Sequence, residues 1–540
     1  MPYYGNPNLV SDKDFHEYTE HEIQEFIKCK EDPIYFCENY IKIIHVDRGI
    51  VPFIPYEYQK NIISTVINNR FTLCKLPRQS GKSTVIVAMI IWMILFNETY
   101  NVALLANKQD QAKELLARLQ LAYENLPKWL QQPVLEWNKN SIELGNGSKV
   151  MAASTSSSSV RGKSFNFIYL DEFAFVPRNI QDQFFNSVFP TITSGETTKM
   201  AITSTPNGMD LFYKLWVDSE NNRNSYKRID IHWSDTPGRD EKWKEEMIKN
   251  TSELQFQQEF GCEFLGSSNT LISGSVLARL PFFDPKQKIN DVRIYEDPKP
   301  GNSYALIADV SRGVGLDYSA FVVVDITKVP YEVVAAFHDN LISPLLFPTL
   351  IHNVGMHYNE AMVAVEINDN GQSIIDALWE EYEYTNIVSS SVSVGRGGVR
   401  MGIDETKQMR RGIRTTSPVK KTGCLNLKTL IETNKLILKD FYIIEELSTF
   451  ALKGTNYEAE PGYHDDLAMC LVLFSWMASQ KYFKEITETD AKDKILMENE
   501  RIMLEKMTPF GMIADGSSVI NIQTGAPDED EFDRDFRLFF

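Results

Sequence analysis

The sequence has few cysteines, no long apolar run and no excess of positive charge. Its six cysteines, spread over 540 residues, form no C-x-x-C pair and no zinc-ligand spacing, which excludes a disulfide scaffold and a structural zinc module. The longest apolar run, residues 85–96, is much shorter than the roughly 20 residues that cross a bilayer. The polar N-terminus lacks the features of a signal peptide. These absences favour a cytosolic protein with reduced, mostly buried thiols, no membrane contact and a buried helix over 85–96.

Positive charge is also too scarce for a protein that binds nucleic acid over its whole surface. The chain has 55 Lys and Arg against 73 Asp and Glu, a net charge of −18. Neutralising phosphates needs clustered Lys and Arg, so only a local basic groove on an acidic body is compatible with nucleic-acid binding. The length predicts two or three domains, and 43% hydrophobic with 24% charged residues is a globular composition.

Hydrophobic patterning predicts an α/β protein with two main domains. Between residues 71 and 206, short apolar strands alternate with amphipathic stretches, which predicts a mostly parallel sheet with helices on both faces. Residues 266–302 are rich in Gly, Pro and Asp, and a second strand set begins near 303. We expect a first domain over 1–265 that includes an N-terminal helical subdomain, a hinge over 266–302, a second domain over 303–515, and an acidic flexible tail over 516–540.

The segment "LPRQSGKST", residues 76–84, matches a phosphate-binding loop except that Leu76 replaces the first glycine. A strand precedes it and a helix follows, so free backbone N–H groups and the positive end of the helix would face an anion. We expect Lys82 to reach the β- and γ-phosphates and the Ser83 hydroxyl to bind Mg²⁺. The predicted nucleotide-binding residues of this loop are Arg78, Gln79, Ser80, Gly81, Lys82, Ser83 and Thr84.

A second signal lies about 90 residues further on, where the apolar strand "FIYLDE" ends in Asp171 and Glu172. In a nucleotide-hydrolysing motor the first carboxylate holds Mg²⁺ through water and the second acts as general base. A lone Asp-Glu pair is more often a solvated strand end, but this pair follows a GKS loop. A third strand, 200–206, ends in Thr203, Ser204 and Thr205, which would couple hydrolysis to motion or simply end a strand before a proline turn.

Two arginines are candidates for stabilising charge in the transition state. Arg78, inside the loop, would contact the γ-phosphate of its own subunit. Arg161, in "SSSSVRGKS", would act as an arginine finger across a subunit interface, or is a solvated loop arginine.

The second half lacks a GKS loop and has carboxylates at the ends of strands instead. Asp309 ends "YALIAD", Glu366 ends "AMVAVE", and Asp465 with Asp466 opens an apolar helix, while Asp317 lies on a turn nearby. Each acid alone is more often a surface carboxylate. Together they can bind two divalent metals that clamp a phosphodiester for attack by water. The order strand-Asp, two strands, strand-Glu, Asp-helix is the layout of ribonuclease H-like nucleases.

One stretch is strongly basic, residues 393–423, with eight Lys or Arg against two acids. It contrasts with the acidic balance of the chain, which favours DNA contact over a solvated loop. The predicted DNA-binding residues are Arg396, Arg400, Lys407, Arg410, Arg411, Arg414, Lys420 and Lys421.

These ordered motifs, spread from about residue 30 to 480, resemble the large subunit of tailed-phage terminases, especially the T-even-like contractile-tailed group. The motifs include "YEYQK", "LPRQSGKST", "SSVRGKSFNFIYLDEFAFVP", "DVSRGVGLDYSAF", "VAVEINDNGQSI" and "GYHDDLAM". The resemblance implies an ASCE (RecA-like) P-loop NTPase domain followed by a ribonuclease H-like nuclease domain. It implies that Gln59 reads adenine, that Arg78, Lys82 and Glu172 act in ATP hydrolysis, and that residues 203–205 couple it to motion. Asp309 and Glu366 match the first two nuclease acids, and the third lies in the Asp465–Asp466 pair, with Asp466 preferred.

The resemblance also implies cofactors, partners and location. The cofactors would be ATP and Mg²⁺, with Mn²⁺ as an alternative metal at the nuclease site. The subunit would form a ring, pentameric by analogy, on the portal of a procapsid in the host cytoplasm, work with a small terminase subunit, cut concatemeric double-stranded DNA, and be absent from the mature virion. The terminal "FDRDFRLFF" would dock on a sliding clamp or the portal. Two alternatives are a DNA repair or recombination ATPase-nuclease without a capsid, for which helicase motifs are missing, and a scaffold with decayed sites.

Overall fold

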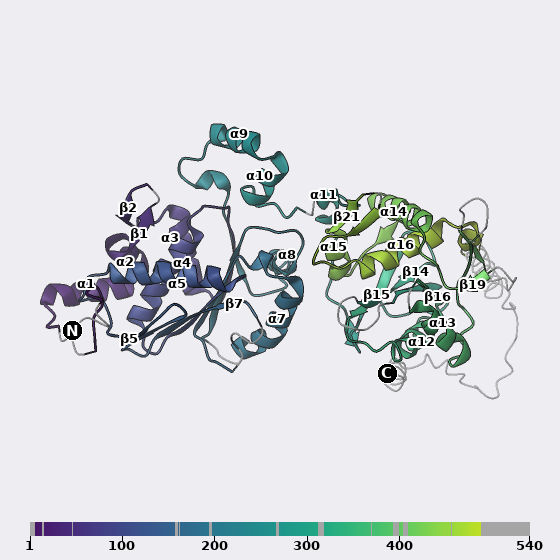
Figure 1. Cartoon of the computed structure of the whole chain (residues 1–540), viewed down its shortest axis with the longest axis horizontal. Helices are drawn as coiled ribbons and strands as arrows, with labels where there is room; N and C mark the ends of the chain where they lie inside the picture. The colour runs from purple at the N-terminus through teal and green to yellow at the C-terminus, as the bar shows by residue number, and fades with distance from the viewer. Residues whose placement is uncertain are drawn as a thin grey trace, which may run out of the picture. The chain divides into compact units, whose positions relative to one another are not determined.

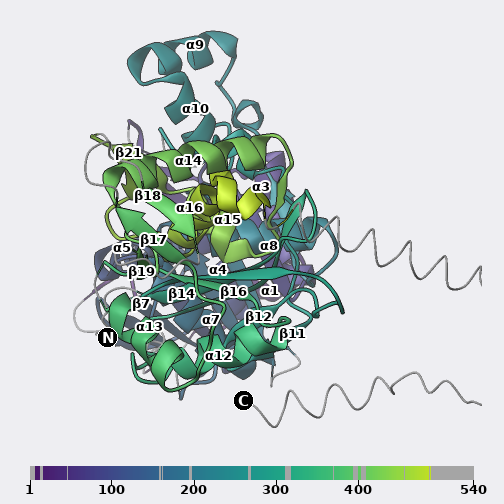
Figure 2. The same ribbon diagram turned by 90° about the vertical axis from the view of Figure 1, so that its right-hand side faces the viewer.

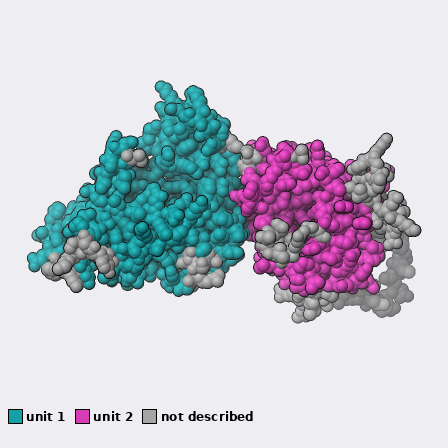
Figure 3. Space-filling view, in the orientation of Figure 1, with its two compact units in different colours: residues 1–265 teal, residues 266–540 magenta. Residues whose placement is uncertain are grey.

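The chain forms two compact units, residues 1–265 and 266–540, in a computed structural model (Figures 1 and 3). Each unit is built around its own mixed sheet. The structure describes residues 6–12, 16–45, 47–156, 160, 162–193, 197–265, 269–310, 318–368, 370–392, 399–402, 409–454, 456–485 and 487.

The sheet of the first unit has the strand order β10-β3-β9-β8-β4-β7-β6-β5. Its first six strands are parallel, and β6 and β5 extend one side antiparallel. This confirms the mostly parallel sheet predicted from the alternation of strands and helices. The strands are β3 (Phe71–Lys75), β4 (Asn101–Ala106), β5 (Val134–Trp137), β6 (Ser141–Leu144), β7 (Lys149–Ser154), β8 (Phe167–Asp171), β9 (Lys199–Ser204) and β10 (Lys227–Asp230).

Helices cover both faces of this sheet (Figure 1). The central helix α4 (Lys82–Phe96) is apolar on every side and is buried almost throughout, because α2 (Pro33–Tyr40), α3 (Glu57–Asn68) and α5 (Gln109–Glu124) surround it. The opposite face is covered by α7 (Arg178–Thr193) and α8 (Leu211–Glu220). Among the described residues, no helix has the length and apolarity needed to cross a membrane.

The N-terminal part of the first unit also contains α1 (Glu20–Glu31) and the hairpin β1 (Lys42–His45) with β2 (Gly49–Pro52). The Thr19 side chain caps α1 by accepting a hydrogen bond from the Glu22 amide. After β10, the helices α9 (Glu241–Asn250) and α10 (Glu253–Glu259) project away from the sheet (Figure 1).

The second unit is a sheet with helices on both faces. Its strand order is β11-β12-β15-β14-β13-β16, with β20 beside β15. Helices α14 and α16 lie on one face, and α12 and α13 lie on the other (Figure 2). The elements are β13 (Tyr304–Asp309), β14 (Ser319–Asp325), β15 (Tyr331–Asp339), β16 (Met362–Val365), β20 (Leu436–Ile437), α12 (Phe347–His357), α13 (Gly371–Glu380), α14 (Ser417–Glu432), α15 (Phe441–Leu447), β21 (Phe450–Lys453), β22 (Asn456–Ala459) and α16 (Asp466–Ser479).

Part of the predicted hinge belongs instead to this second sheet. Residues 266–302 contain α11 (Gly274–Leu277), β11 (Gln287–Ile289) and β12 (Val292–Ile294), and β12 pairs with β15 through Arg293 and Ala336. Each strand is three residues long, too short for a periodic pattern to be visible between the surrounding Gly, Pro and Asp residues. The prediction of a hinge over the whole segment is therefore wrong for 287–294.

The predicted basic loop is folded in part. Strands β17 (Ser389–Val392), β18 (Val399–Gly402) and β19 (Met409–Arg411) form a small antiparallel sheet. The six cysteines are buried and form no disulfide, in agreement with the sequence.

Candidate nucleotide and nuclease sites

The GKS loop connects β3 to the first turn of α4, as predicted. Gln79 and Gly81 have positive φ values of 56° and 73°, which turn the chain into the helix. Leu76 is fully buried, and its amide donates to the carbonyl oxygen of Ser204 at 3.1 Å. Leu76 therefore extends the pairing of β3 with β9, and the turn that the first glycine usually makes falls later in the loop.

The catalytic lysine and glutamate predicted from separate motifs are in contact. Lys82, which is 8% exposed, forms an ion pair through Nζ with Oε1 of Glu172. Glu172 directly follows β8 and has a φ of 49°, a backbone conformation that is uncommon for a residue with a side chain. Its Oε2 accepts long hydrogen bonds from the amide and hydroxyl of Thr205, at 3.4 and 3.5 Å. The backbone of Glu172 thus directs its carboxylate toward the loop.

The neighbouring Asp171 is held in a buried polar network. The Tyr169 hydroxyl donates to Oδ1 of Asp171 at 2.7 Å, and the Thr203 hydroxyl donates to the same oxygen at 3.1 Å. Burial raises the pKa of Asp171, and the charge of Lys82 partly offsets this effect. At the ends of β8 and β9, two of the predicted coupling residues therefore contact the carboxylates: Thr203 contacts Asp171, and Thr205 contacts Glu172.

Arg78 and Gln59 have intramolecular partners that their predicted roles did not anticipate. Arg78 Nε is 2.5 Å from Oε2 of Glu259, so part of its guanidinium is already engaged within the subunit. Gln59 is buried on α3, where its carboxamide accepts from the Tyr56 amide at 3.0 Å and donates to the Ser80 carbonyl oxygen at 3.3 Å. A Cβ atom at Gly81 would lie 2.6 Å from Nε2 of Gln59. In this structure Gln59 therefore supports the loop directly.

Two residues missed in the sequence also hold the loop. Arg239 Nη2 donates to the carbonyl oxygens of Arg78 at 2.8 Å and Gln79 at 3.1 Å. The Tyr58 hydroxyl donates to the carbonyl oxygen of Ser80 at 2.6 Å. Arg239 stands alone in a breaker-rich stretch and matches no motif, so no signal in the sequence marks it.

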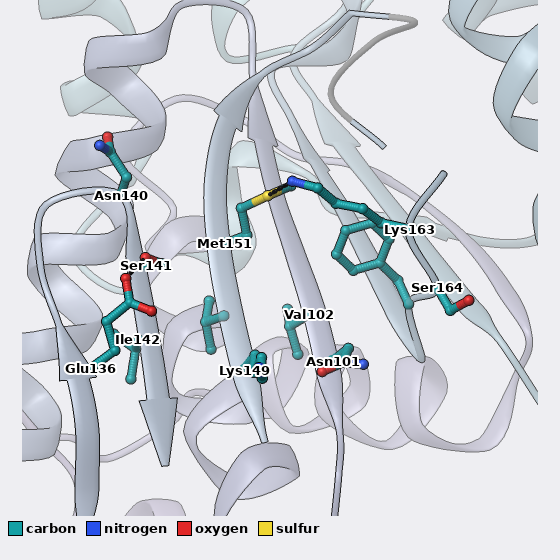
Figure 4. Close-up of a pocket in the computed structure, with 12 residues that line it drawn as sticks. Asn101, Val102, Glu136, Asn140, Ser141, Ile142, Lys149, Met151, Lys163 and Ser164 are labelled. Carbon is teal, nitrogen blue, oxygen red and sulfur yellow. Dashed lines mark hydrogen bonds between the residues drawn. The ribbon is translucent and has the colours of Figure 1, made fainter. Parts of the chain in front are cut away.

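The pocket in Figure 4, about 540 Å³ in volume, lies away from this site. It is lined by Asn101 and Lys149, where the parallel strands β4 and β7 begin, and by Ser141 and Lys163. The GKS loop and Glu172 lie at the other edge, where the parallel strands end. The pocket therefore does not belong to the nucleotide site.

Two of the predicted nuclease acids lie side by side. Strands β13 and β16 are parallel, with Ala308 opposite Val365, so Asp309 and Glu366 follow at the same level. Their carboxylates are close enough for the charge of Glu366 to act on Asp309. Burial raises the pKa of Asp309 well above its ordinary value, and the charges of Glu366, Asp466 and Asp465 raise it further.

The Asp465–Asp466 pair at the start of α16 completes this group of acids. A fifth carboxylate, Glu446, lies beside it and accepts a hydrogen bond from the Ala468 amide in the first turn of α16 at 2.9 Å. Burial and the charge of Asp466 raise the pKa of Glu446. Glu446 was missed because it lies on the internal helix α15 rather than at a strand end.

The donor set of the second site fits a divalent cation. Carboxylate oxygens are the ligands that Mg²⁺ and Mn²⁺ prefer, and a cation would relieve the repulsion that raises the pKa of Asp309. Within the described ranges, however, no group of three or more His, Cys, Asp or Glu side chains already forms a metal-binding cluster.

Part of the basic segment lies directly beside Glu366. The Ile413 amide donates to the Val365 carbonyl oxygen at 2.9 Å. Asn368 bridges the two chain segments, donating from Nδ2 to Oε1 of Glu366 at 2.8 Å and to the Thr415 carbonyl oxygen at 3.0 Å. Arg414, the residue after Ile413, is exposed.

The other basic residues have mixed surroundings. Arg410 on β19 and Lys421 on α14 are exposed, whereas the Arg411 guanidinium lies 3.5 Å from the ring centroid of Trp379. Lys420 lies 5.7 Å from the Phe450 ring. The backbone of Arg400 lies in β18. The predictions for Arg161, Asp317, Arg396, Lys407 and the tail 516–540 concern residues outside the described part of the chain.

The two sites define the class of protein: a P-loop unit with a strand-end glutamate, followed by a ribonuclease H-like unit with strand-end acids. Comparison with known proteins agrees with this class. One family model, described as the T4likevirus-type N-terminal part of the terminase large subunit, matches residues 73–279, and another, the terminase RNaseH-like domain, matches 306–474. Together they cover most of the chain, which belongs to the terminase large subunit family.

Individual relatives are distant. The terminase large subunit of Thermus phage G20c is 24% identical over 443 residues, which are 74% of this chain and 82% of the relative. Tripartite terminase subunit 3 of human herpesvirus 8 is 24% identical over 131 residues, which are 23% of this chain and 18% of the relative. Among solved structures, the large terminase of bacteriophage HK97 matches with 14% identity and a TM-score of 0.45, over 83% of this chain and 99% of that chain.

Proposed function

We propose that this protein is the ATP-driven motor and nuclease of viral DNA packaging. It would translocate double-stranded DNA into a procapsid and cut concatemeric viral DNA. The observation that carries the proposal is the contact of Lys82 with Glu172 and Glu172 with Thr205, which joins three separate motifs of a nucleotide-hydrolysing motor at one sheet edge. Membership of the terminase large subunit family supports it.

In the first unit each residue has a distinct proposed task. The loop N–H groups and Lys82 bind the phosphates, and the Ser83 hydroxyl and Asp171 hold Mg²⁺, which screens phosphate charge. Glu172 accepts the proton of the attacking water. Thr205, in contact with Glu172, would carry the change at that carboxylate into β9 and the chain beyond it. Arg78 would join the site when its ion pair with Glu259 opens, and Arg161 would act from a neighbouring subunit.

In the second unit, Asp309, Glu366 and Asp466, with Asp465, would hold Mg²⁺ or Mn²⁺, which supplies the charge that stabilises a pentavalent phosphate. Asn368 fixes the Glu366 carboxylate through its bond to Oε1. The exposed Arg410 and Arg414 would bind the DNA backbone. The pairing of Ile413 with Glu366 and the end of β16 supports this role, because it brings part of a basic segment next to Glu366 on an otherwise acidic chain.

The proposed partners are those that DNA packaging requires. They are double-stranded DNA, the portal of the procapsid, a small terminase subunit and further copies of this chain in a ring, pentameric by analogy. The C-terminal tail would dock on a sliding clamp or the portal. The protein would act in the host cytoplasm, docked transiently on the procapsid, and would be absent from the mature virion.

A packaging assay with purified procapsids, linear DNA and ATP tests the proposal. We expect Lys82→Ala to abolish ATP turnover and packaging while DNA nicking continues. Asp309→Ala should abolish nicking while ATP turnover and packaging of pre-cut DNA continue. The exposed residues Lys139 and Asp376 provide matched controls, because Lys139→Ala and Asp376→Asn change the same charges away from both sites.

The outcomes separate the alternatives. Loss of both activities from either variant, in protein that remains folded, would refute the assignment of two independent sites. An ATPase that purified portals or procapsids fail to stimulate would favour a repair or recombination enzyme instead.

A further inference from the structure

An aromatic lobe, residues 233–260, lies against the phosphate-binding loop. Its core is a cluster of four rings, in which Trp233 and Trp243 stack with centroids 5.9 Å apart, and Phe256 and Phe260 pack edge-on or tilted against them. Helices α9 and α10 form the body of this lobe, which projects from the sheet (Figure 1). The lobe thus has its own small aromatic core.

Arg239 joins this lobe to the loop. Its guanidinium lies 4.8 Å from the ring centroid of Trp243 and 5.4 Å from that of Phe260, so two rings fix its plane. From this plane, Nη2 donates to the carbonyl oxygens of Arg78 and Gln79. The other terminal nitrogen, Nη1, is buried and has no hydrogen-bond partner within the described chain.

The lobe makes a second connection at the same point. The Arg78 amide donates to the carbonyl oxygen of Glu259 at 3.0 Å, and the two side chains form an ion pair. On the sheet side, Tyr58 binds the Ser80 carbonyl oxygen. The carbonyl oxygens of all three consecutive residues 78–80 are therefore bound by side chains.

These contacts determine where the loop N–H groups point. A peptide bond is planar and trans, so its N–H is directed opposite to its C=O. Because Arg239 and Tyr58 bind the carbonyl oxygens of residues 78, 79 and 80, the N–H groups of Gln79, Ser80 and Gly81 face away from those side chains. N–H groups that converge in this way at a helix N-terminus form an anion site. Thus Arg239 acts on the phosphate cradle without occupying it.

We propose that Arg239 is a positioning residue of the nucleotide site, which orients the loop N–H groups and links phosphate binding to the aromatic lobe. The proposal rests on the proposed ATPase function. The role of Arg239 requires a side chain that binds two adjacent carbonyl oxygens and at the same time stacks on the Trp243 ring. Arginine does both because its guanidinium is a planar fork, whereas the lysine ammonium is a compact, strongly hydrated point charge.

The proposal predicts a graded series of steady-state kinetics on the full-length chain. We expect Arg239→Ala to raise the KM for ATP about tenfold and to lower kcat, since the cradle loses its orientation in the ground and transition states. Arg239→Lys should have nearly the thermal stability of the wild type, but its KM and kcat should remain close to those of Arg239→Ala. Lys242→Ala, an exposed change of charge on the same lobe, is the control and should match the wild type.

Tryptophan fluorescence gives a readout that a merely structural role would not change. If phosphate binding moves the lobe through Arg239, ATP should alter the emission of Trp243. This component should be missing in Trp243→Phe and strongly reduced in Arg239→Lys, while Lys82→Ala should lack it because it does not bind ATP.

The results separate this inference from the function on which it rests. A wild-type protein without ATP hydrolysis would overturn the proposed function. A wild-type protein that hydrolyses ATP, together with a folded Arg239→Lys that keeps wild-type KM, kcat and fluorescence response, would overturn the role of Arg239 alone. If Arg239→Ala does not fold, Arg239→Lys decides the question.

Discussion

Lys82 and Glu172, which are ninety residues apart in the chain, form an ion pair at the carboxyl edge of the first sheet. A nucleotide phosphate and the Glu172 carboxylate thus compete for the same ammonium group. Binding of a phosphate would draw Lys82 from Glu172 and leave the carboxylate free to accept a proton from water. If Glu172 is the general base, the ion pair would keep it inactive until the substrate is bound.

Replacing the glutamate should separate nucleotide binding from hydrolysis. Glu172→Gln retains the size of the side chain but cannot accept the proton, so we expect ATP turnover to fall by about 10²–10⁴-fold while ATP binding is kept or tightened. Phosphate release and the binding of a fluorescent ATP analogue measure the two quantities. The matched control is Glu143→Gln. Glu143 lies on β6, and its Oε1 is 3.1 Å from Nζ of Lys149 on β7. Near-normal turnover by Glu172→Gln would contradict the assignment of the base.

A single glycine should prove essential for the nuclease site. A Cβ at Gly371 would lie 1.7 Å from the Glu366 carbonyl oxygen, so the first turn of α13 can approach the end of β16 only without a side chain. We expect Gly371→Ala to displace Glu366 and lower DNA nicking at least tenfold, with ATP turnover unchanged. Gln372→Ala, the next residue along and exposed, should nick DNA normally. Normal nicking by Gly371→Ala would show that the position of Glu366 is not critical.

Much of both sites could be predicted from the sequence because their residues lie in local patterns. The GKS loop, the Asp171–Glu172 pair and Asp309 each follow an apolar strand. Residues that follow neighbouring parallel strands meet at the same edge of the sheet. Strands β3, β9 and β8 are such neighbours, and so are β13 and β16. The chemistry and the approximate location therefore follow from strand pattern and order.

The remaining features depend on contacts between distant segments that leave no local pattern. Arg239 reaches the loop across 160 residues, and Glu446 meets α16 from a neighbouring helix. Strand β12 is identified by its pairing with β11 and β15. In each case packing, rather than periodicity or a motif, decides the partner.

The exposed Arg410 and Arg414 of the basic segment should contribute to DNA binding through charge. We expect Arg410→Ala and Arg414→Ala each to weaken binding about equally for all DNA sequences. Each should also reduce the slope of log K against log salt by roughly 1, as expected when one phosphate contact is lost. Lys428→Ala, which removes a lysine paired with Glu432 further along α14, is the control. An unchanged salt slope in both arginine variants would place the DNA elsewhere on the protein.

A buried ion pair should control the stability of the second unit. Arg293 on β12 and Asp440, which caps α15, are 2.5 Å apart, and the Tyr295 hydroxyl donates to the same carboxylate at 2.8 Å. Burial by itself would raise the pKa of Asp440, but the Arg293 charge and hydrogen bond outweigh it and hold the pKa below 3.8. Asp440→Asn keeps the cap but leaves the guanidinium buried without its counter-charge, which costs about 3 kcal/mol.

Thermal unfolding of the full-length chain, with hydrogen exchange in 287–294 to identify the second unit, measures this cost. Since the folded-state pKa lies below the unfolded value of 3.8, the wild-type pair contributes its full stability above that pH and loses it as the pH falls further. We therefore expect Asp440→Asn to lower the Tm of the second unit at neutral pH by roughly 10 °C and to flatten its decline in acid. The exposed Asp376→Asn should change neither. Equal acid sensitivity of Asp440→Asn and wild type would mean that other carboxylates govern acid unfolding, and that β12 is held in the sheet by its backbone pairing alone.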